Sequence, residues 1–418
     1  MGIALYLHIP FCIQKCRYCD FNSYAGYGPE EQQRYVDALL REMALWAARP
    51  EMAGTPVSTL YIGGGTPTAL DGALLERLIR AVGEYFALEP GAEVTLEANP
   101  GTVDIQGEKL HRAFAAGANR ISFGVQARQE YLLRRLGRIH TAAEVEKAVA
   151  AAREAGFTNI NLDLMYGLPE QTPAEFRETL HWALSLEPTH ISAYSLIVEE
   201  GTPFFAAQQA GRLPLPPEEA EEEMAADAVR ILGAAGLEQY EVSNFARPGF
   251  RCRHNLVYWR NEPYLGLGCG AHSFLTLQAP LDNLGPAGPH LSASRVQGDS
   301  HVATAPGRPG DHYRFWNLRT PAAYQAALEA GRLPVEAGEA LDEAGEMAET
   351  MIMGLRMVEG VSEARFAARF GRSVTSVYGQ VLERLERQGL LVRQDGAVRL
   401  TPRGMRLGNR VWMEFLPD

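Results

Sequence analysis

The sequence of 418 residues has no long apolar run, few cysteines and no excess of positive charge. No stretch approaches the roughly 18 apolar residues of a membrane-spanning helix, and residues 4–8 are too short for the apolar part of a signal peptide. The 51 acidic residues outnumber the 39 basic ones, and the net charge of -12 argues against a protein that binds phosphate backbones. We therefore expect no nucleic acid partner, no membrane span and no export.

The five cysteines are too few for a disulfide-rich secreted protein and are typical of a reducing compartment. We expect a cytoplasmic protein. Apolar residues make up 46% of the chain, which is enough for a large core, and the length of 418 residues favours two or three domains.

Cys12, Cys16 and Cys19 stand close together in the spacing C-x3-C-x2-C. Packing alone does not explain three thiols so near one another, so we interpret them as metal ligands. Three thiolates suit an iron–sulfur cluster of four irons, which leaves one iron free to bind a small molecule. The alternatives are a zinc site, which would need a fourth ligand, and three buried apolar cysteines.

Short apolar runs alternate with longer segments of helical period in the first half of the chain, the pattern of a parallel sheet covered by helices. A helix with a regular apolar face follows Pro29, and a capping box of Thr141 and Glu144 begins another. Residues 203–217 indicate a linker, and residues 218–235 a further helix. Six strands are predicted, at residues 4–8, 59–62, 93–97, 120–125, 159–165 and 190–196.

Functional residues of parallel βα architectures gather at the carboxyl ends of the strands. Three glycines at residues 63–65 follow the second predicted strand and let the backbone approach a ligand closely, although a tight turn alone could require them. Glu97, Gln126 and Asp163 lie on the next three strands, where a polar group is costly to bury without a partner. Their side chains contact either a ligand or another side chain of the protein. An example of the second case is a structural ion pair of Arg138 with Asp163.

The cysteine spacing and the flanking residues 6–12, YLHIPFC, resemble the radical S-adenosylmethionine (SAM) superfamily. Within it they resemble the group that contains the oxygen-independent coproporphyrinogen III oxidases and the HemW haem chaperones. The resemblance implies an α/β fold: an open, partial (β/α)6 barrel at residues 1–235, followed by a smaller C-terminal α+β domain at residues 236–418. It also implies a 4Fe-4S cluster on the three cysteines, with SAM bound to it. The positions that match SAM contacts of the family are Tyr6, Gly64, Gly65, Thr66, Glu97, Gln126, Arg138 and Asp163.

A second motif, His-Asn-x-x-Tyr-Trp, runs from His254 to Trp259. From chemistry alone it is either a structural histidine in an aromatic cluster or a group that ligates iron and packs on a macrocycle. The motif resembles the haem chaperone branch, which implies that His254 binds haem. Further on, Cys269 is expected to be buried, and His272 is a weaker candidate for a ligand or substrate contact.

Residues 275–312 are rich in Pro, Gly and Ser and depart from the family pattern, so we expect a flexible insertion with solvated histidines at 290, 301 and 312. From residue 346 to residue 402 the chain indicates two amphipathic helices and a hairpin, a winged-helix-like segment. Its acidic residues, Glu383 and Glu386, and the acidic chain argue against DNA binding. The resemblance implies a cover or interaction module.

Three functions remain open, so the sequence does not decide whether the chain is an enzyme. The first is a chaperone that binds haem and delivers it to an acceptor protein, with any membrane contact only through that acceptor. The second is the oxidative decarboxylation of coproporphyrinogen III in porphyrin biosynthesis, and the third is a different radical SAM reaction. The decarboxylases carry a further cysteine where this chain has Phe21, and they have an N-terminal extension. With the motif at His254, these features favour the chaperone.

Overall fold

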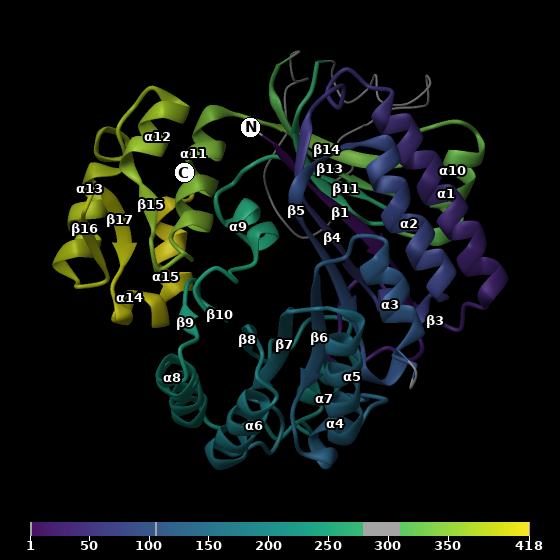
Figure 1. The fold of residues 1–418 in the computed structure, drawn as a ribbon. Coiled ribbons are helices and arrows are strands. Elements are labelled where there is room, and N and C mark those ends of the chain that lie inside the picture. The colour runs from purple at the N-terminus through teal and green to yellow at the C-terminus, as the bar shows by residue number, and fades with distance from the viewer. Residues whose placement is uncertain (1, 105–106, 279–309, 418) are drawn as a thin grey trace.

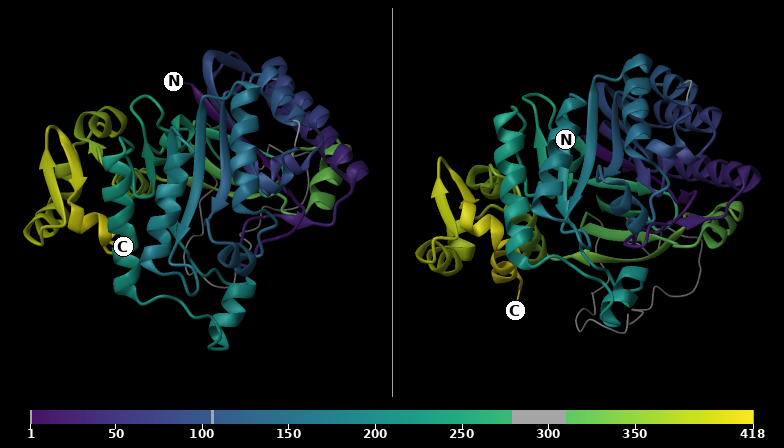
Figure 2. Two further views of the ribbon diagram at one scale, coloured as in Figure 1. Left: turned by 60° about the horizontal axis from the view of Figure 1, so that its bottom comes forward. Right: turned by 90° about the horizontal axis from the view of Figure 1, so that it is seen from below.

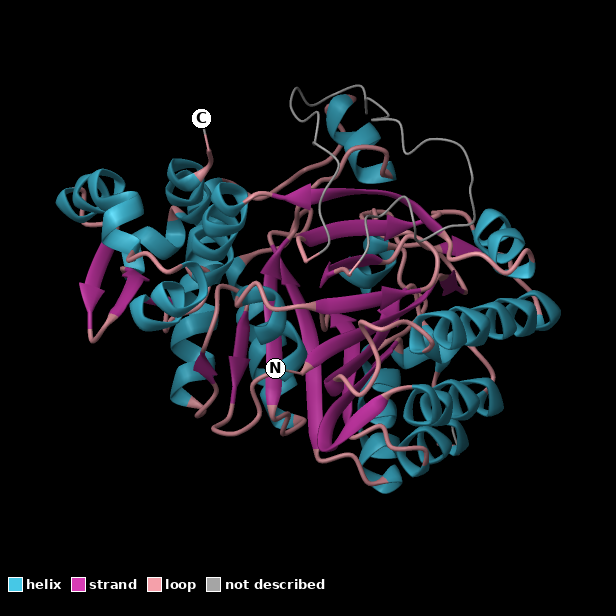
Figure 3. Ribbon diagram, turned by 90° about the horizontal axis from the view of Figure 1, so that it is seen from above, coloured by secondary structure: helices cyan, strands magenta, loops and turns pink. Residues whose placement is uncertain are grey.

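The computed structural model describes residues 2–104, 107–278 and 310–417 (Figure 1). Within these ranges twelve strands form one sheet, in the order β14-β13-β12-β11-β1-β4-β5-β6-β7-β8-β10-β9. Figure 3 shows these strands fanning across the centre of the molecule. None of the helices in the described ranges is long and apolar enough to cross a membrane.

Six parallel strands form the central part of the sheet, and all six were predicted from the sequence. The sheet does not close, because β1 and β8 pair with strands of the second half of the chain and not with each other. This confirms the open, partial barrel. The six strands are β1 (Ile3–Ile9), β4 (Pro56–Gly64), β5 (Ala87–Ala98), β6 (Arg120–Gln126), β7 (Asn159–Tyr166) and β8 (His190–Ser195).

Helices cover the outer face of these strands. The apolar face of the first helix is confirmed, since Tyr35, Leu39 and Met43 are fully buried in the main core. The predicted capping box of Thr141 and Glu144 is confirmed as well. The helices are α1 (Pro29–Ala47), α2 (Gly72–Tyr85), α3 (Glu108–Ala115), α4 (Glu130–Leu136), α5 (Ala142–Ala155), α6 (Pro173–Ser185) and α8 (Glu218–Ala234).

The prediction of a linker at residues 203–217 is wrong in its first half, which forms the helix α7 (Pro203–Gln209). Thr202 caps this helix by accepting a hydrogen bond from the backbone N–H of Phe205 at 3.1 Å. Proline at the first helical position favours the start of a helix. The N–H group that proline lacks would have no partner within the helix at this position. Phe204 anchors the helix in a small apolar cluster beside α4.

The second half of the chain extends the same sheet on both sides. On one edge β11 (Tyr264–Leu267) pairs in parallel with β1, and β12 (His272–Thr276), β13 (His312–Asn317) and β14 (Val335–Leu341) follow antiparallel. On the other edge β10 (Asn244–Ala246) pairs with β8, and β9 (Glu238–Gln239) with β10. The strands before and after residue 235, where we predicted a division, therefore share one sheet.

Most of the predicted insertion, including His290 and His301, lies outside the described residues. Its two ends belong to strands, since β12 runs to Thr276 and β13 begins at His312. His312 is not a solvated loop residue: its Nδ1 atom lies 2.8 Å from a carboxylate oxygen of Glu346.

The C-terminal part has its own core and confirms the winged-helix-like pattern. A three-stranded sheet in the order β15-β17-β16 packs with helices beside the main sheet (Figure 2). The elements are α11 (Glu343–Gly354), β15 (Val361–Ser362), α12 (Glu363–Phe370), α13 (Val374–Arg387), β16 (Leu391–Gln394), β17 (Ala397–Leu400), α14 (Pro402–Arg406) and α15 (Gly408–Trp412). The remaining strands and α-helices are β2 (Phe11–Cys12), β3 (Tyr24–Ala25), α9 (Arg253–Trp259) and α10 (Pro321–Glu329).

A fully buried carboxylate on α1 connects the two halves of the chain. Glu42 accepts hydrogen bonds from the N–H of Gly268 at 2.8 Å, from Asn317 Nδ2 at 2.7 Å and from the hydroxyl of Tyr324 at 2.6 Å. These donors come from the residues after β11, from β13 and from α10. Burial raises the pKa of Glu42 to about 7 even though the three donors favour its ionised form.

We expect Glu42→Gln to destabilise the protein and to change how its stability depends on pH. In the variant, the amide nitrogen would face one of the hydrogen-bond donors that now bind the carboxylate. That donor would lose its acceptor, which should lower the free energy of unfolding by about 1–3 kcal/mol. Since the folded pKa lies above the ordinary value of 4.5, the contribution of Glu42 is complete below about pH 4.5 and is lost as the pH rises through about 7. Urea unfolding of both proteins between about pH 4.5 and 8 measures this effect. A stability difference that stays constant over this range would contradict it.

Candidate functional site

A cavity of about 400 Å³ lies at the carboxyl ends of the parallel strands. The three cysteines of the first motif line it, together with seven of the eight residues predicted to contact SAM. The structure thus brings together residues from six separate segments. These seven residues are Gly64, Gly65, Thr66, Glu97, Gln126, Arg138 and Asp163.

The loop that carries the cysteines is fixed by hydrogen bonds with distant segments. The N–H of Arg17 donates to the carbonyl of Leu136 at 2.9 Å, and Gln14 Nε2 donates to the carbonyl of Gly137 at 3.0 Å. On the other side, the N–H of Phe204 in α7 donates to the carbonyl of Arg17 at 3.0 Å. The cysteines therefore lie on a supported loop. Burial raises the pKa of the Cys12 and Cys19 thiols, so that binding a metal there would release protons.

The glycine run of residues 63–65 packs directly on the cysteine loop. The N–H of Gly65 donates to the carbonyl of Ile9 at 2.8 Å, and the N–H of Thr66 donates to the carbonyl of Phe11 at 2.7 Å. Gly64 has a φ of 110°, and a Cβ atom there would overlap the imidazole of His8. The run is thus required by the turn, one of the two explanations that the sequence left open.

Glu97, the residue before the end of β5, lines the cavity and binds the segment of the glycine run. Its carboxylate accepts hydrogen bonds from the hydroxyl of Tyr61 at 2.7 Å and from the N–H of Gly64 at 3.1 Å. Burial raises the pKa of Glu97 to about 7. A half-buried carboxylate with only two donors can accept a hydrogen bond from a further cationic or hydroxyl group.

Arg138 and Asp163 both face the cavity, but no ion pair joins them in the described part of the chain. Asp163 accepts hydrogen bonds from Ser122 at 3.1 Å and from Asn161 at 2.7 Å, while burial raises its pKa. Arg138 donates to Cys16 Sγ over 3.5 Å and to the carbonyl of Gly124. The structural ion pair that we considered from the sequence is therefore not formed.

Gln126 is placed by an unusual backbone. It has a φ of 71°, at the point where the pairing of β6 with β7 shifts its register. Such a conformation is costly for a residue other than glycine and persists only where its surroundings enforce it. Here the side chain turns into the cavity and accepts a hydrogen bond from the hydroxyl of Tyr194 at 3.0 Å.

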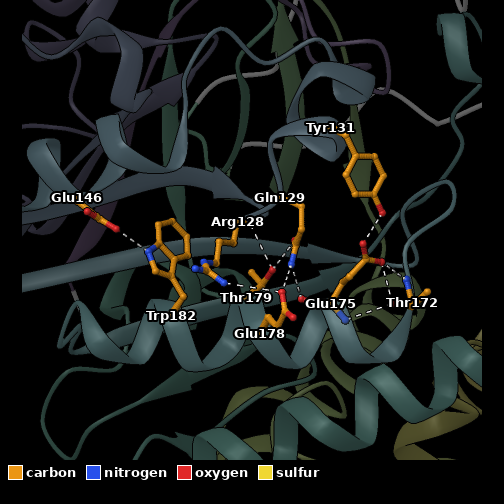
Figure 4. A network of polar contacts seen from close by, with 9 residues as sticks. All are labelled: Arg128, Gln129, Tyr131, Glu146, Thr172, Glu175, Glu178, Thr179 and Trp182. Carbon is orange, nitrogen blue, oxygen red and sulfur yellow. Dashed lines mark hydrogen bonds and ion pairs between the residues drawn. The ribbon is translucent and has the colours of Figure 1, made fainter.

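A polar network holds the segment that follows Gln126 (Figure 4). Gln129 donates to the carbonyl of Glu175 at 2.9 Å and accepts from Thr179 at 3.0 Å, and the hydroxyl of Tyr131 donates to Glu175 at 2.7 Å. These contacts fasten the start of α4 to α6. They therefore fix the backbone that leads from Gln126 to Arg138.

Tyr6 is the predicted residue that does not line the cavity. Its hydroxyl hydrogen-bonds with Nδ1 of His8 at 3.0 Å, and its ring stacks on Tyr61, the partner of Glu97. Sequence reasoning also missed several cavity residues. Tyr18 lies between two cysteines, and Tyr194 lies near the end of the sixth strand. These positions alone could have indicated that both residues line the cavity. The missed residues include Tyr18, Ser23, Asn99, Ser122, Met165, Tyr194, Ile197 and Glu199.

The sequence model of the radical SAM superfamily matches residues 6–183, and that of the HemN C-terminal domain matches residues 341–407. The chain is 39% identical to a protein named heme chaperone HemW from Bacillus subtilis over 423 residues, which cover 99% of both chains. It belongs to the HemW family. A protein of the same name from Lactococcus lactis is 34% identical over 415 residues, covering 99% of this chain and 97% of the other.

A solved structure supports the fold of this HemW family member. The coproporphyrinogen III oxidase HemN from Escherichia coli, described as a radical SAM enzyme, superimposes with a TM-score of 0.78 at 25% identity. The match covers 99% of this chain and 90% of that one. The superfamily and the fold expected from the sequence are thus confirmed.

The helix α9 holds the motif that begins at His254 in this HemW family chain. The imidazole is buried, with Nδ1 at 2.8 Å from the hydroxyl of Thr59 and Nε2 at 2.9 Å from the hydroxyl of Tyr258. It stacks on Tyr61 with ring centres 5.1 Å apart. Both ring nitrogens are therefore occupied, which matches the structural alternative that the sequence left open for this residue.

The last residue of the motif contacts the C-terminal part of the chain. The guanidinium of Arg356 lies 4.4 Å from the ring centre of Trp259 and 5.0 Å from that of Trp412. Cation–π contacts of this kind, partly shielded from water, stabilise by about 0.5–2 kcal/mol each. Trp259 thus joins α9 to the C-terminal part through Arg356.

Hydrogen bonds also cross the inside of the sheet from the cavity to α9. Asn161, which binds Asp163, contacts Nδ1 of His190 at 2.6 Å, and Nε2 of His190 contacts the hydroxyl of Tyr240 at 2.8 Å. The same hydroxyl accepts a hydrogen bond from the N–H of Cys252, the residue before α9, at 3.3 Å. The inner face is therefore polar, and hydrogen bonds join these groups to one another.

We expect His254→Ala to destabilise the fold. The change removes a buried ring and leaves the hydroxyls of Thr59 and Tyr258 without their partner, so the free energy of unfolding should fall by about 2–4 kcal/mol. Urea unfolding measures this loss, and His181→Ala, at an exposed position on α6, is the control. A change within about 0.5 kcal/mol for His254→Ala would show that the residue has no structural role.

Proposed function

We propose that this chain is a haem chaperone that holds a 4Fe-4S cluster on Cys12, Cys16 and Cys19, binds SAM beside it, and delivers haem to an acceptor protein. Its principal support is a single observation: the three thiols and the polar residues at the strand ends line one cavity, in a chain whose full-length relatives are named heme chaperone HemW. When bound, such a cluster can supply one electron to SAM.

The donors at the site suit a cluster better than a single metal ion. In the described ranges, no three His, Cys, Asp or Glu side chains are grouped as they would be around one ion. A four-iron cluster distributes its thiolates over different irons. Three cysteines that line one cavity suit such a cluster, whereas a structural zinc ion would need a fourth ligand.

The polar residues of the cavity suit the groups of SAM. Glu97 and Asp163 offer carboxylate oxygens to its ammonium and hydroxyl groups, and Gln126 offers an amide. The buried Nε atom of Arg138 has no hydrogen-bond partner in the described structure, which leaves a charged donor for the carboxylate of the methionine part. Tyr6 does not line the cavity, but its ring stacks on Tyr61, which donates a hydrogen bond to Glu97.

Replacing Cys12, Cys16 and Cys19 together with Ala should abolish the charge-transfer absorption of the anaerobically reconstituted protein and its bound iron, because no thiolate remains to hold the cluster. Iron analysis and absorption spectra measure this. The control is Cys269→Ala, which removes a buried thiol outside the cavity and should leave both unchanged. An unchanged spectrum in the triple variant would mean that other residues hold the iron.

The decarboxylase alternative draws support from the likeness to HemN. Against it, Phe21 stands where those enzymes carry a further cysteine, and its side chain is 64% exposed at the cavity.

Reconstituted protein should bind haem stoichiometrically. It should form no protoporphyrinogen IX from coproporphyrinogen III with SAM and a reductant. Chromatography of the products checks this, and conversion with consumption of SAM would establish the enzyme instead. A third product formed from haem and SAM would identify another radical SAM reaction.

A further inference from the structure

Arg120 is the first residue of β6 and is only 2% exposed. The next residues along the strand show which way its side chain points. Ile121 and Phe123 belong to the main core under the helices, whereas Ser122 lines the cavity and donates to Asp163 at 3.1 Å. Because side chains alternate along a strand, Arg120 lies on the inner face of the sheet, two residues from the cavity.

The buried guanidinium of Arg120 has no direct partner in the described ranges. Its Nε atom makes no hydrogen bond, and no ion pair joins the side chain to a carboxylate. The hydroxyl of Thr95, directly opposite on β5, is also buried without a partner. A buried charge is costly unless other charges compensate it. The charge of Arg120 is therefore balanced by groups that it does not touch.

Most of the titratable groups that surround Arg120 are uncharged. Burial shifts the pKa of the tyrosines and the cysteine upward and the pKa of the histidines downward, so these side chains are neutral near pH 7. The charged neighbours are three carboxylates, Glu93, Glu97 and Asp163. Such surroundings disfavour an anionic ligand for the guanidinium. The neutral groups are Tyr61, His190, Tyr240, Cys252 and His254.

The three carboxylates differ in what else compensates them. Glu93 accepts two backbone N–H groups at the start of α9, both at 3.0 Å, where the helix dipole favours an anion. Glu97 and Asp163 have no helix start of this kind and form no ion pair in the described part of the chain. Their donors are uncharged: Tyr61 and Gly64 for Glu97, and Ser122 and Asn161 for Asp163. These two carboxylates therefore depend on a charge at a distance.

Burial and Arg120 act in opposite directions on these two carboxylates. Burial raises the pKa of Glu97 to about 7 and also raises the pKa of Asp163, while the charge of Arg120 lowers both. Glu97 is thus close to the point at which it loses its charge. The other titratable groups that face Glu97 or Asp163 are tyrosines whose pKa burial raises: Tyr6, Tyr18, Tyr61, Tyr194 and Tyr258.

We propose that Arg120 is a positioning residue of the SAM site: from below the cavity, its buried charge keeps Glu97 and Asp163 ionised. In this form both carboxylates can accept hydrogen bonds from the ammonium and hydroxyl groups of SAM. Arg120 itself touches neither SAM nor the cluster and acts through the two carboxylates. The inference rests on the proposed function, since it concerns the binding of SAM.

The test titrates the full reconstituted chain with SAM under anaerobic conditions, between about pH 6 and about pH 9. Arg120→Met removes the charge, so the two carboxylates should keep their protons to a higher pH than in the wild type. We expect the variant to bind SAM about tenfold more weakly at about pH 6, and nearly as well at about pH 9, where both carboxylates are ionised in either protein. Arg120→Lys keeps the charge and should keep the wild-type profile. The titration of SAM and of the cluster is common to all proteins and cancels in the ratio of affinities.

Arg112→Met, at an exposed position on α3, is the matched control and should leave SAM binding unchanged at every pH. The absorption of the reconstituted cluster shows whether each variant is folded. If Arg120→Met does not fold, Arg120→Gln, which keeps polar atoms in the interior, should show the same pH dependence. An affinity ratio that does not change with pH would mean that Arg120 has no role or a merely structural one, and would overturn the inference. If the wild-type chain binds no SAM, the proposed SAM site fails instead.

Discussion

The parallel pairing of β1 with β4 is the constraint on which the site depends. The register places Ile9 opposite Gly64, and the ladder continues past both strand ends through the hydrogen bonds of Gly65 with Ile9 and of Thr66 with Phe11. The cysteine loop and the glycine run are thereby one unit. A Cβ atom at Gly65 would lie within 3 Å of the carbonyl oxygens of Ile9 and Phe11, so a side chain there would separate the two loops.

The inside of the sheet imposes a second constraint, because it is lined with polar groups that water cannot reach. Glu93 illustrates how they are satisfied: its carboxylate accepts hydrogen bonds from the N–H groups of Arg253 and His254, both at 3.0 Å. The first N–H groups of a helix have no partner within it, and an anion at this end is favoured by the helix dipole. The helix α9 thus completes the inner face of the partial barrel, although it lies far from it in sequence.

Features that depend on local sequence were predictable, and features that depend on distant partners were not. The six strands follow from apolar runs, and the cavity residues follow from the rule that strand ends meet at one edge. The contacts of His254 could not be predicted from its motif, because its partners Thr59 and Tyr61 lie on β4. The sequence did not predict that β11 to β14 extend the main sheet, because the residues of a short strand do not specify which strand pairs with it. In α7, Pro203 starts a helix, whereas we interpreted it as part of a linker.

The contact of Arg356 with Trp259 and Trp412 makes α9 a link between the C-terminal domain and the cavity. The helix has seven residues, a length of about 10 Å, and it is too short to bend. One end carries His254, stacked on the tyrosine that donates to Glu97, and the other carries Trp259, pressed against the guanidinium from the C-terminal domain. A continuous chain of contacts therefore runs from Arg356 through the two ends of α9 and Tyr61 to Glu97 in the cavity.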